Sequence, residues 1–455
     1  MRFATILLLL PACATVAQDP FAHETQIREY VQPYLDNEVC NALSIGVIHG
    51  DQEWIAHFGQ LSDEQPASPN DRTMYEIGSV SKVFTGLLLA DAVQAGTVKL
   101  DQPIGTLLKK LQETNPEVGE SITLLHLSTH NSGLPRLPDN LAPADIKNPY
   151  ADYGRDRLTD FLCRVKPKDK PNTVTAYSNL GAGLLGDLLA AKADVDYDTL
   201  LKRAITKPLE MNDTTVVLSA AQRARMAPPH NVGLGSDTLW DFDALAGAGG
   251  IRSTVPDMLR FIAAVLQPSD TELGKAIELA WKQYVPSRDG QFAMGLGWHI
   301  ARDGSTRWHN GQTGGYHSVL FINRDLKAGV VVLGNTASGQ IDTIGESIIQ
   351  MLAGMKVKQP SFEPVKQIDE AQMKRLIGKY RLVPGFVLDV RLEKDRLMVQ
   401  ATNQPALRVY PESETRWKYR VVPAEITFEL PEEGSATALT LKQNGREMRA
   451  PRIND

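Results

Sequence analysis

The chain has 455 residues, of which 42% are hydrophobic and 22% are charged, and its formal net charge at pH 7 is -6. A chain of this length can bury a large core and favours two or more domains, and its composition is that of an ordinary globular protein. The acidic balance provides no basic surface for a phosphate backbone, which excludes nucleic-acid binding as the main function.

The first residues have the features of an export signal. A positive residue, Arg2, precedes the short apolar run 3–10, and residues 15–17 offer a cleavage site before Gln18. We therefore expect residues 1–17 to be a signal peptide and the mature protein to be periplasmic.

A lipoprotein signal is the alternative for this segment. Residues 10–13 resemble a lipoprotein cleavage box, which would acylate Cys13 and tether the protein to a membrane. Pro11 and the very short apolar run weaken this alternative. No later stretch approaches the ~18 apolar residues that span a bilayer, so no transmembrane segment is expected.

Two cysteines remain in the mature chain, Cys40 and Cys163. They can form one disulfide in an oxidising compartment, or they can be two buried thiols, and the sequence does not choose between these states. Two cysteines alone define neither a disulfide scaffold nor a metal site.

The first predicted element is a β-hairpin. Residues 42–48 and 54–59 have strand-like composition, and the glycine-containing turn 49–52 separates them. A helix is expected over 80–94, because apolar residues recur there at helical spacing until Gly96 stops the pattern.

The middle of the chain, residues 121–266, is predicted to be rich in helices. It mixes helical runs such as 181–191 with turns that contain proline and glycine. Strand patterns return at 315–323 and 328–333, and an amphipathic helix is expected over 341–352. The sequence therefore predicts a sheet built from both ends of this region, with a helical block inserted between them.

The last part of the chain is predicted to be a separate all-β domain over 365–455. Lysine, glutamine and proline dominate residues 355–364, which indicates a linker. Beyond it, apolar and polar residues alternate in short segments, and the turns 393–395 and 443–445 support strands around them. The six predicted strands are 378–382, 387–392, 396–400, 407–410, 425–430 and 438–443.

A serine stands at the start of the predicted helix 80–94, and a lysine follows three residues later. These residues, Ser79 and Lys82, share one face of a helix. A serine hydroxyl becomes a good nucleophile only when a neighbour accepts its proton, and a lysine can accept it when burial and other cations lower its pKa. The alternative is a helix-capping serine beside a solvated lysine, which the pair alone does not exclude.

Two further polar segments could share a site with this pair. Tyr177-Ser178-Asn179 stands just before the helical run 181–191, and the alternative for it is a capped turn. Residues 308–315 are rich in glycine and lead into a strand, where glycines let a ligand approach an edge strand closely. A plain hairpin turn is the alternative for this segment.

Together the three segments resemble the serine β-lactamase and DD-peptidase superfamily, whose three boxes are Ser-x-x-Lys, Tyr-x-Asn or Ser-x-Asn, and Lys-x-Gly or His-x-Gly. The boxes of this chain begin at Ser79, Tyr177 and His309, in the order of that family. The tyrosine is similar to the class C β-lactamase branch. Further similarity lies in residues 124–135, 247–253 and 295–298, and the resemblance covers residues 25–355.

The resemblance implies an α/β (α+β) fold for a catalytic domain over 18–354. In that fold an antiparallel sheet is flanked by helices and an α-rich region is inserted into it. The C-terminal domain is similar to the small β-barrel appended to some class C-like peptidases and esterases. Neither a cofactor nor a metal is expected.

The resemblance also assigns roles to residues. Ser79 would be the acylated nucleophile, and Lys82 and Tyr177 would handle the protons. The backbone N–H groups of Ser79 and Gln312 would form the oxyanion hole, where one donor is typically worth ~3–4 kcal/mol. Asn179 would hold the substrate amide and Lys82. The remaining expected substrate contacts are Asn310, Gly311 and Thr313.

The third box departs from class C β-lactamases, which have a lysine where this chain has His309. An unperturbed histidine, with a pKa near ~6.5, is mostly neutral at pH 7. We expect the protonated form of His309 to bind an anionic group of the substrate, or to hold Tyr177 ionised. His-x-Gly is also familiar in DD-peptidases and D-aminopeptidases of this branch.

Two other sets of residues have side chains that can bind ligands. His299, His309 and His317 lie close in sequence, but no histidine or cysteine framework supports a metal site around them. Arg136 and Arg252 are candidates for binding a carboxylate, although an isolated arginine is usually a solvated surface group.

The leading functional prediction is a serine hydrolase of the bacterial envelope that hydrolyses β-lactam antibiotics through a covalent acyl-enzyme. The first alternative uses the same residues as a DD-carboxypeptidase, a D-aminopeptidase or an esterase. The second is a cell-wall or β-lactam sensor that is acylated without turnover or does not react. The expected partner is a small-molecule or peptidoglycan-derived substrate. An α/β-hydrolase is disfavoured because the chain has no Gly-x-Ser-x-Gly.

Overall fold

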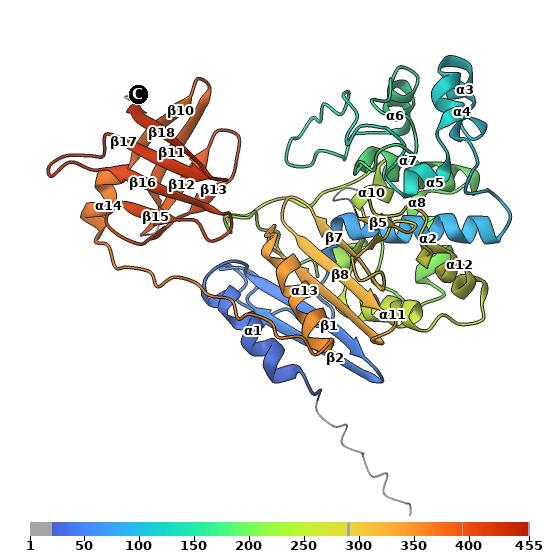
Figure 1. Ribbon diagram of the computed structural model, residues 1–455, viewed down its shortest axis with the longest axis horizontal. Coiled ribbons are helices and arrows are strands. Elements are labelled where there is room, and N and C mark those ends of the chain that lie inside the picture. The colour runs from blue at the N-terminus through green and yellow to red at the C-terminus, as the bar shows by residue number, and fades with distance from the viewer. Residues whose placement is uncertain (1–20, 289–291, 394, 454–455) are drawn as a thin grey trace, which may run out of the picture.

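The computed structural model describes residues 21–288, 292–393 and 395–453 (Figure 1). The predicted signal peptide, Cys13 and residue 394 of one predicted turn lie outside the described residues. Within these ranges no helix combines the length and the apolar composition that a bilayer crossing needs. Cys40 and Cys163 are both free thiols, so the alternative of a disulfide between them is not realised.

A seven-stranded antiparallel sheet lies at the centre of the larger part of the molecule, in the order β2-β1-β9-β8-β7-β6-β5. The N-terminal hairpin therefore pairs with strands from far along the chain, as the sequence predicted. A separate two-stranded sheet joins β3 (Tyr75–Glu76) to β4 (Arg252–Ser253). The strands of the main sheet are β1 (Ala42–His49), β2 (Gln52–Gly59), β5 (Ala293–Met294), β6 (His299–Ile300), β7 (Thr306–Gln312), β8 (His317–Asn323) and β9 (Ala328–Gly334).

Helices cover both faces of this sheet, which explains why its central strands are apolar without alternation. Helices α1 (Glu24–Asp36) and α13 (Gln340–Leu352) pack on one face, where Val319 meets α13. Helix α11 (Val255–Leu266) packs on the opposite face, toward which Leu320 points. A strand enclosed on both sides cannot shift without displacing packed side chains, so the sheet supports its ends rigidly.

The predicted helical block is inserted between the two groups of strands (Figure 1). Its elements are η1 (Gly78–Val80), α2 (Ser81–Gln94), η2 (Ile104–Thr106), α3 (Lys109–Thr114), α4 (Pro116–Ser121), α5 (Leu124–Ser128), α6 (Arg155–Leu162), α7 (Asn179–Lys192), α8 (Tyr197–Leu201), η3 (Lys202–Thr206), α9 (Ala220–Arg223), α10 (Ala246–Gly249) and α12 (Glu272–Trp281). Residues 81–90 of α2 are all buried, because α7, α10 and α12 surround that helix. A helix enclosed in this way has no polar face, and α2 is apolar around most of its circumference.

A second antiparallel sheet of nine strands makes up the C-terminal part. Its outermost strands, β13 (Ala406–Arg408) and β14 (Tyr410–Pro411), are separated in the chain by Val409 alone. The sheet must therefore curl until it nearly closes, as the predicted small β-barrel requires. The other elements are α14 (Glu370–Leu376), β10 (Gly378–Val383), β11 (Phe386–Glu393), β12 (Arg396–Ala401), β15 (Arg416–Lys418), β16 (Ala424–Glu429), β17 (Ala438–Gln443) and β18 (Arg446–Ile453).

The two parts of the chain touch through a cluster of charges. Glu38, just after α1, pairs with Arg396 at 3.0 Å and also with Arg408, both from the C-terminal sheet. Nearby, Gly233 lies so close to the same sheet that a Cβ there would be 1.9 Å from the Ala406 carbonyl oxygen. The contact combines these charged pairs with Val421 of the C-terminal part, which packs against the core of the larger part.

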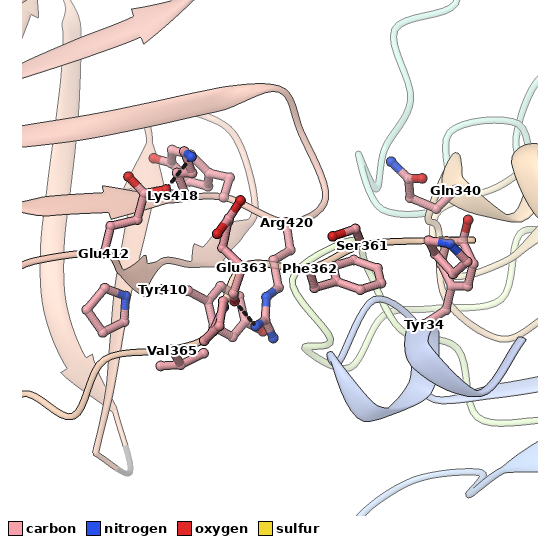
Figure 2. Close-up of a pocket in the computed structure, with 14 residues that line it drawn as sticks. Tyr34, Gln340, Ser361, Phe362, Glu363, Val365, Tyr410, Glu412, Lys418 and Arg420 are labelled. Atoms are coloured by element: carbon pink, nitrogen blue, oxygen red, sulfur yellow. Dashed lines mark hydrogen bonds and ion pairs between the residues drawn. The ribbon is translucent and has the colours of Figure 1, made fainter. Parts of the chain in front are cut away.

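The connecting segment 355–364 has neither helix nor strand, but one of its side chains is anchored (Figure 2). Phe362 packs edge-on against Tyr34 of α1, with ring centroids 5.7 Å apart. On its other side Arg420 lies over the Phe362 ring, 5.8 Å from the centroid, and also over Tyr410 at 3.9 Å. These contacts line a cavity of about 340 Å³ between the two parts, which is separate from the site described next.

Candidate active site

Ser79 lies where the main sheet meets the helical block. It is half-buried in η1, between β3 and α2. Lys82, one turn later, is 2% exposed, and its Nζ lies 2.9 Å from Ser79 Oγ. The same Nζ donates a hydrogen bond to the Ala248 carbonyl at 2.6 Å, a backbone partner that no sequence motif predicts. The structure thus brings the predicted serine and lysine together and fixes the amine.

The environment of Lys82 lowers its pKa. Burial is the main cause that brings the pKa well below its ordinary value, and the charge of Arg136 lowers it further. An amine whose pKa has been lowered in this way holds a free lone pair at a lower pH than a solvated lysine, so it can accept the Ser79 proton. The alternative of a solvated lysine is wrong, because Lys82 is buried where α7, α10 and α12 pack around α2.

Tyr177 is the third residue at this point, just before α7. Its hydroxyl is hydrogen-bonded to Ser79, and Lys82 Nζ lies 4.8 Å from the centroid of its ring. Burial raises the pKa of Tyr177 well above its ordinary value, although the Ser79 hydrogen bond and the Arg136 charge oppose the shift. The phenol is therefore protonated at neutral pH. It can relay a proton, but it is not a phenolate that could act as the base.

Three histidine rings surround Tyr177. The ring centroids of His130, His309 and His299 lie 4.5, 6.1 and 6.3 Å from that of Tyr177. Burial is the largest cause that lowers the pKa of all three, to about 4 for His299, and the charge of Lys82 lowers them further. The cluster is therefore neutral at pH 7 and adds no positive charge to the site.

His309 lies beside Tyr177, as the sequence predicted, but it is fully buried. Its Nδ1 is 2.6 Å from the Asn310 carbonyl, and its Nε2 has no hydrogen-bond partner among the described residues. The expectation that protonated His309 binds an anionic substrate group is wrong, because burial and the neighbouring His299 and Lys82 hold its pKa well below the ordinary value.

The close approach of β7 to η1 brings two backbone N–H groups together. Gly78 has a φ of +48°, and a Cβ on it would lie 2.7 Å from the Gln312 nitrogen. A Cβ on Gly311 would lie 2.8 Å from the Ser79 nitrogen. Only glycine permits these approaches, which set the N–H groups of Ser79 and Gln312 side by side as an oxyanion hole requires.

Asn179, the last residue of the second box, points its amide toward the same cavity. Its Nδ2 donates to the Tyr150 hydroxyl at 3.3 Å, while its buried Oδ1 has no partner in the described part of the chain. That oxygen can accept a hydrogen bond from a substrate amide. The predicted contact between Asn179 and Lys82 is not formed; the hydrogen-bond partners of Lys82 Nζ are Ser79 Oγ and the Ala248 carbonyl.

The sheet-side wall of the site is a hydrogen-bonded chain. Asn310 Nδ2 donates to Asp342 Oδ2 at 2.7 Å, and His317 Nε2 lies 2.7 Å from Asp342 Oδ1. The other ring nitrogen of His317 lies 3.1 Å from Gln312 Oε1. Asp342 belongs to α13, whereas Asn310 and His317 belong to β7 and β8. The sequence did not predict Asp342 as a site residue, because no motif links it to these strands.

The two arginine candidates occupy different environments. Arg252 is 2% exposed, donates to the Val216 carbonyl at 2.5 Å and lies 3.4 Å from the Glu76 carboxylate. It is therefore a structural residue under the site. Arg136 is exposed, and its guanidinium carbon lies 4.9 Å from the centroid of the Tyr177 ring.

A buried carboxyl, Glu76, lies beneath the site, between Arg252 and the lining residue Trp240. It accepts a hydrogen bond from the Trp240 backbone at 2.8 Å. Burial raises its pKa to about 7, although the charge of Arg252 opposes the shift. The hydroxyl of Thr313, predicted as a substrate contact, has no hydrogen-bond partner among the described residues.

One cavity of about 550 Å³ joins these groups. Lys82, His309 and Gly311 lie behind its surface rather than on it. The described ranges hold no group of histidine, cysteine and acidic side chains that could bind a metal ion. The predicted site residues on its lining are Ser79, Tyr177, Asn179, Asn310, Gln312 and Thr313.

Comparisons with known proteins find relatives for both parts of the chain. The beta-lactamase family matches residues 27–348, and a domain of unknown function, DUF3471, matches residues 363–452. A beta-lactamase of Escherichia coli K12 is 28% identical over 306 residues, which are 65% of this chain and 74% of that protein. The D-alanyl-D-alanine-carboxypeptidase/endopeptidase AmpH of the same organism is 29% identical over 272 residues, 58% of this chain and 69% of that protein.

Solved structures show the same architecture. A class C beta lactamase superposes with a TM-score of 0.65 at 22% sequence identity, over 73% of this chain and 100% of that one. The likeness confirms the predicted fold class, a class C beta-lactamase-like fold. The family match covers well over half of the sequence. The chain therefore belongs to the beta-lactamase family.

Proposed function

We propose that the protein is a serine hydrolase that opens β-lactam amides through a covalent Ser79 ester. The observation that carries this proposal is the 2.9 Å distance between Lys82 Nζ and Ser79 Oγ in an enclosed site. Burial lowers the pKa of that lysine, so the base stands within reach of the nucleophile before any substrate arrives.

Acylation transfers one proton and exchanges one bond. Lys82 takes the Ser79 proton while Oγ attacks the lactam carbonyl carbon, and the N–H groups of Ser79 and Gln312 stabilise the negative oxygen. When the intermediate collapses, the carbon–nitrogen bond breaks and the nitrogen needs a proton. Tyr177, protonated and hydrogen-bonded to Ser79, relays the proton from Lys82 to that nitrogen.

Deacylation reverses these roles with water as the nucleophile. A water molecule attacks the ester carbonyl and gives its proton to the Lys82 and Tyr177 pair. The oxygen–carbon bond of the ester then breaks, and Ser79 leaves with a proton from the same pair. The product is the ring-opened acid, and the enzyme returns to its starting state.

A peptidase or esterase activity is the second candidate. The neutral His309 favours it, because the third box offers no fixed cation to a carboxylate on the leaving group. A substrate with a neutral leaving group, such as an ester or an internal peptide bond, does not need a cation in the third box for binding. The relative AmpH is named as both a carboxypeptidase and an endopeptidase.

The test is intact-mass analysis during turnover of a panel of substrates: a penicillin, a cephalosporin, a short-chain ester and a D-alanyl peptide. A β-lactamase gains the acyl mass briefly and returns to its free mass, whereas a sensor stays modified. Ser79→Ala should show neither labelling nor turnover, while Ser121→Ala, an exposed serine on α4, should behave as the wild type. Labelling retained in Ser79→Ala would disprove the proposal.

We infer that this activity belongs to the periplasm, because residues 1–17 have the features of an export signal. Fractionation of cells that express the full chain tests this inference. The mass of the mature N-terminus would distinguish cleavage before Gln18 from acylation at Cys13, and protein retained in the cytoplasm would contradict both.

A further inference from the structure

Arg136 stands out among the groups that line the active-site cavity. No other arginine or lysine is present among the described residues of that lining. The side chain of Arg136 is exposed, and within residues 21–288, 292–393 and 395–453 it has no carboxylate partner. An arginine without a counter-ion at the mouth of a cavity is available to a ligand.

The position of Arg136 is fixed from two directions. Its backbone carbonyl accepts hydrogen bonds from the nitrogens of Asn179 at 3.0 Å and of Leu180 at 3.1 Å, which ties it to the start of α7. Its guanidinium stacks over the Tyr177 ring, 4.9 Å from the centroid. The charge is therefore held beside the second box and does not sweep freely through solvent.

The other positive groups near the cavity are not free to bind an anion. Lys82 is enclosed and bonded to Ser79 and Ala248, and Arg252 is buried with its own partners. His309 is buried and neutral.

Two lining residues of the sheet side, Asn310 and His317, are held by the carboxylate of Asp342, whose negative charge disfavours an anion on that side. An anionic group in the cavity is therefore directed to the helical side, where Arg136 and Asn179 lie next to each other. On that side the amide oxygen of Asn179 has no partner, and it can accept a hydrogen bond from the amide N–H of an acyl group.

We propose that Arg136 is a specificity-determining residue that binds a carboxylate carried by the acyl part of the substrate. This inference rests on the proposed function, since the acyl part is the portion that becomes esterified to Ser79. The substrate class it names is an acyl donor with an acidic group beside the reacting carbonyl, such as a peptide with an acidic residue on the acyl side. Recognition of the leaving group is a separate matter.

Two penicillins provide the probe, because α-carboxybenzylpenicillin and benzylpenicillin differ by one carboxylate on the acyl side chain. The ratio of their kcat/KM values, or of their acylation rate constants if turnover is slow, is measured for the wild type and for Arg136→Gln. We expect Arg136→Gln to lower the anionic-to-neutral ratio about threefold to tenfold, the range of a partly exposed charge pair. Arg136→Lys should keep part of the ratio, because it retains the charge but loses the planar fork.

Arg302→Gln is the matched control, since Arg302 is exposed at the turn between β6 and β7 and lies outside the cavity. It should leave the ratio unchanged. Added salt should lower the wild-type ratio and have little effect on that of Arg136→Gln. An equal change of both penicillins in Arg136→Gln would overturn the inference while leaving the proposed function intact.

A binding measurement separates this inference from the proposed function. Dissociation constants of the two penicillins are measured on Ser79→Ala, which cannot be acylated, with and without Arg136→Gln. A preference for the anionic compound that Arg136→Gln removes would support the inference even if the wild type hydrolysed no acyl donor. Absence of any such preference would overturn it.

Discussion

The two sheets of this molecule are built on opposite plans. In the main sheet, β8 and β9 are buried along their whole length because helices cover both faces. In the C-terminal sheet, β16 alternates buried and exposed residues, as a curled sheet with one dry face must. The groups proposed for chemistry all gather beside the first sheet, where enclosure lowers the pKa of an amine and excludes water. The second sheet offers its side chains to solvent, where charges act independently.

Glycines show the same contrast. Gly78, at the end of the covered sheet, has a φ of +48° and would place a Cβ 2.7 Å from the Gln312 nitrogen. Gly385, in the β10–β11 turn of the second sheet, has a φ of +79° and nothing within 4 Å of its Cβ position. The first glycine is needed for a close approach of two backbones, and the second only for a turn.

The largest expected effect concerns the enclosed pair. Lys82→Ala and Tyr177→Phe should each lower the acylation rate by about a thousandfold or more, and the double variant should be scarcely slower than either, because both serve one proton transfer. Stopped-flow acylation by a penicillin measures this. Losses that multiply would show that the two residues act separately. Arg449→Ala in the second sheet, where Arg449 pairs with Glu429 at the surface, should leave the rate unchanged.

The glycine contrast predicts the next largest effect. Gly78→Ala should separate the N–H groups of Ser79 and Gln312 and lower kcat by roughly a hundredfold, the scale of one lost oxyanion donor. Gly385→Ala should destabilise its turn by about 1 kcal/mol and leave kcat alone. Steady-state kinetics and thermal unfolding of the two variants test this. Equal losses of activity would break the distinction between the two regions.

A pH profile tests the lowered pKa of Lys82. If neutral Lys82 accepts the Ser79 proton, kcat/KM should fall as the pH drops through the lowered pKa of that lysine. Arg136 contributes to the lowering, so Arg136→Gln should raise the pKa of Lys82 and move this acid limb to higher pH. Arg302→Gln should leave it in place.

Glu76 is the competing source of such a limb, because burial raises its pKa to about 7. Protonation of Glu76 would weaken its pairing with Arg252 and its acceptance from Trp240 as the pH falls. A limb that disappears in Glu76→Gln and does not move in Arg136→Gln would belong to Glu76 rather than to Lys82.

The smallest effect is expected at the contact between the two parts. Glu38→Gln removes the carboxylate that Arg396 and Arg408 share. It should weaken the contact between the two parts by about 1 kcal/mol and change kcat/KM less than twofold. Limited proteolysis should then cut within 355–364 faster than in the wild type. Glu24→Gln, at an exposed pair on α1, is the control. Loss of activity in Glu38→Gln would mean that the C-terminal sheet supports the site.

Local patterns were enough to predict the three boxes, most strands of the C-terminal sheet and several elements of the main sheet, but few of the helices one by one. The hairpin β1–β2, the helix α2 and the strands β8 and β9 follow from periodicity, because burial on one or both faces imposes a repeat on the sequence. The strands β15 and β18 and the helix α14 were not predicted. The last strand, β18, carries charges along much of its length, and its strand character comes from pairing with β17.

The roles of single polar residues depended on packing that no local pattern contains. Arg136 and Arg252 were equal candidates in the sequence, but one is exposed at the cavity and the other is enclosed under it. His309 was in the correct box, yet its charge state follows from the other rings that surround it. The Ala248 carbonyl that holds Lys82 is a backbone atom, and its position depends on the contact between α10 and α2.

The buried free thiol of Cys40 affects the reactivity of the protein toward disulfides. Burial raises its pKa to about 12, and only a thiolate attacks a disulfide, so the folded chain takes almost no part in thiol–disulfide exchange through this residue. Unfolding would expose the thiols of both Cys40 and Cys163. A disulfide between them would then hold the chain in a state that differs from the native fold, in which both thiols are free. Under oxidising conditions, burial of Cys40 in the core beside α1 would compete with formation of that bridge.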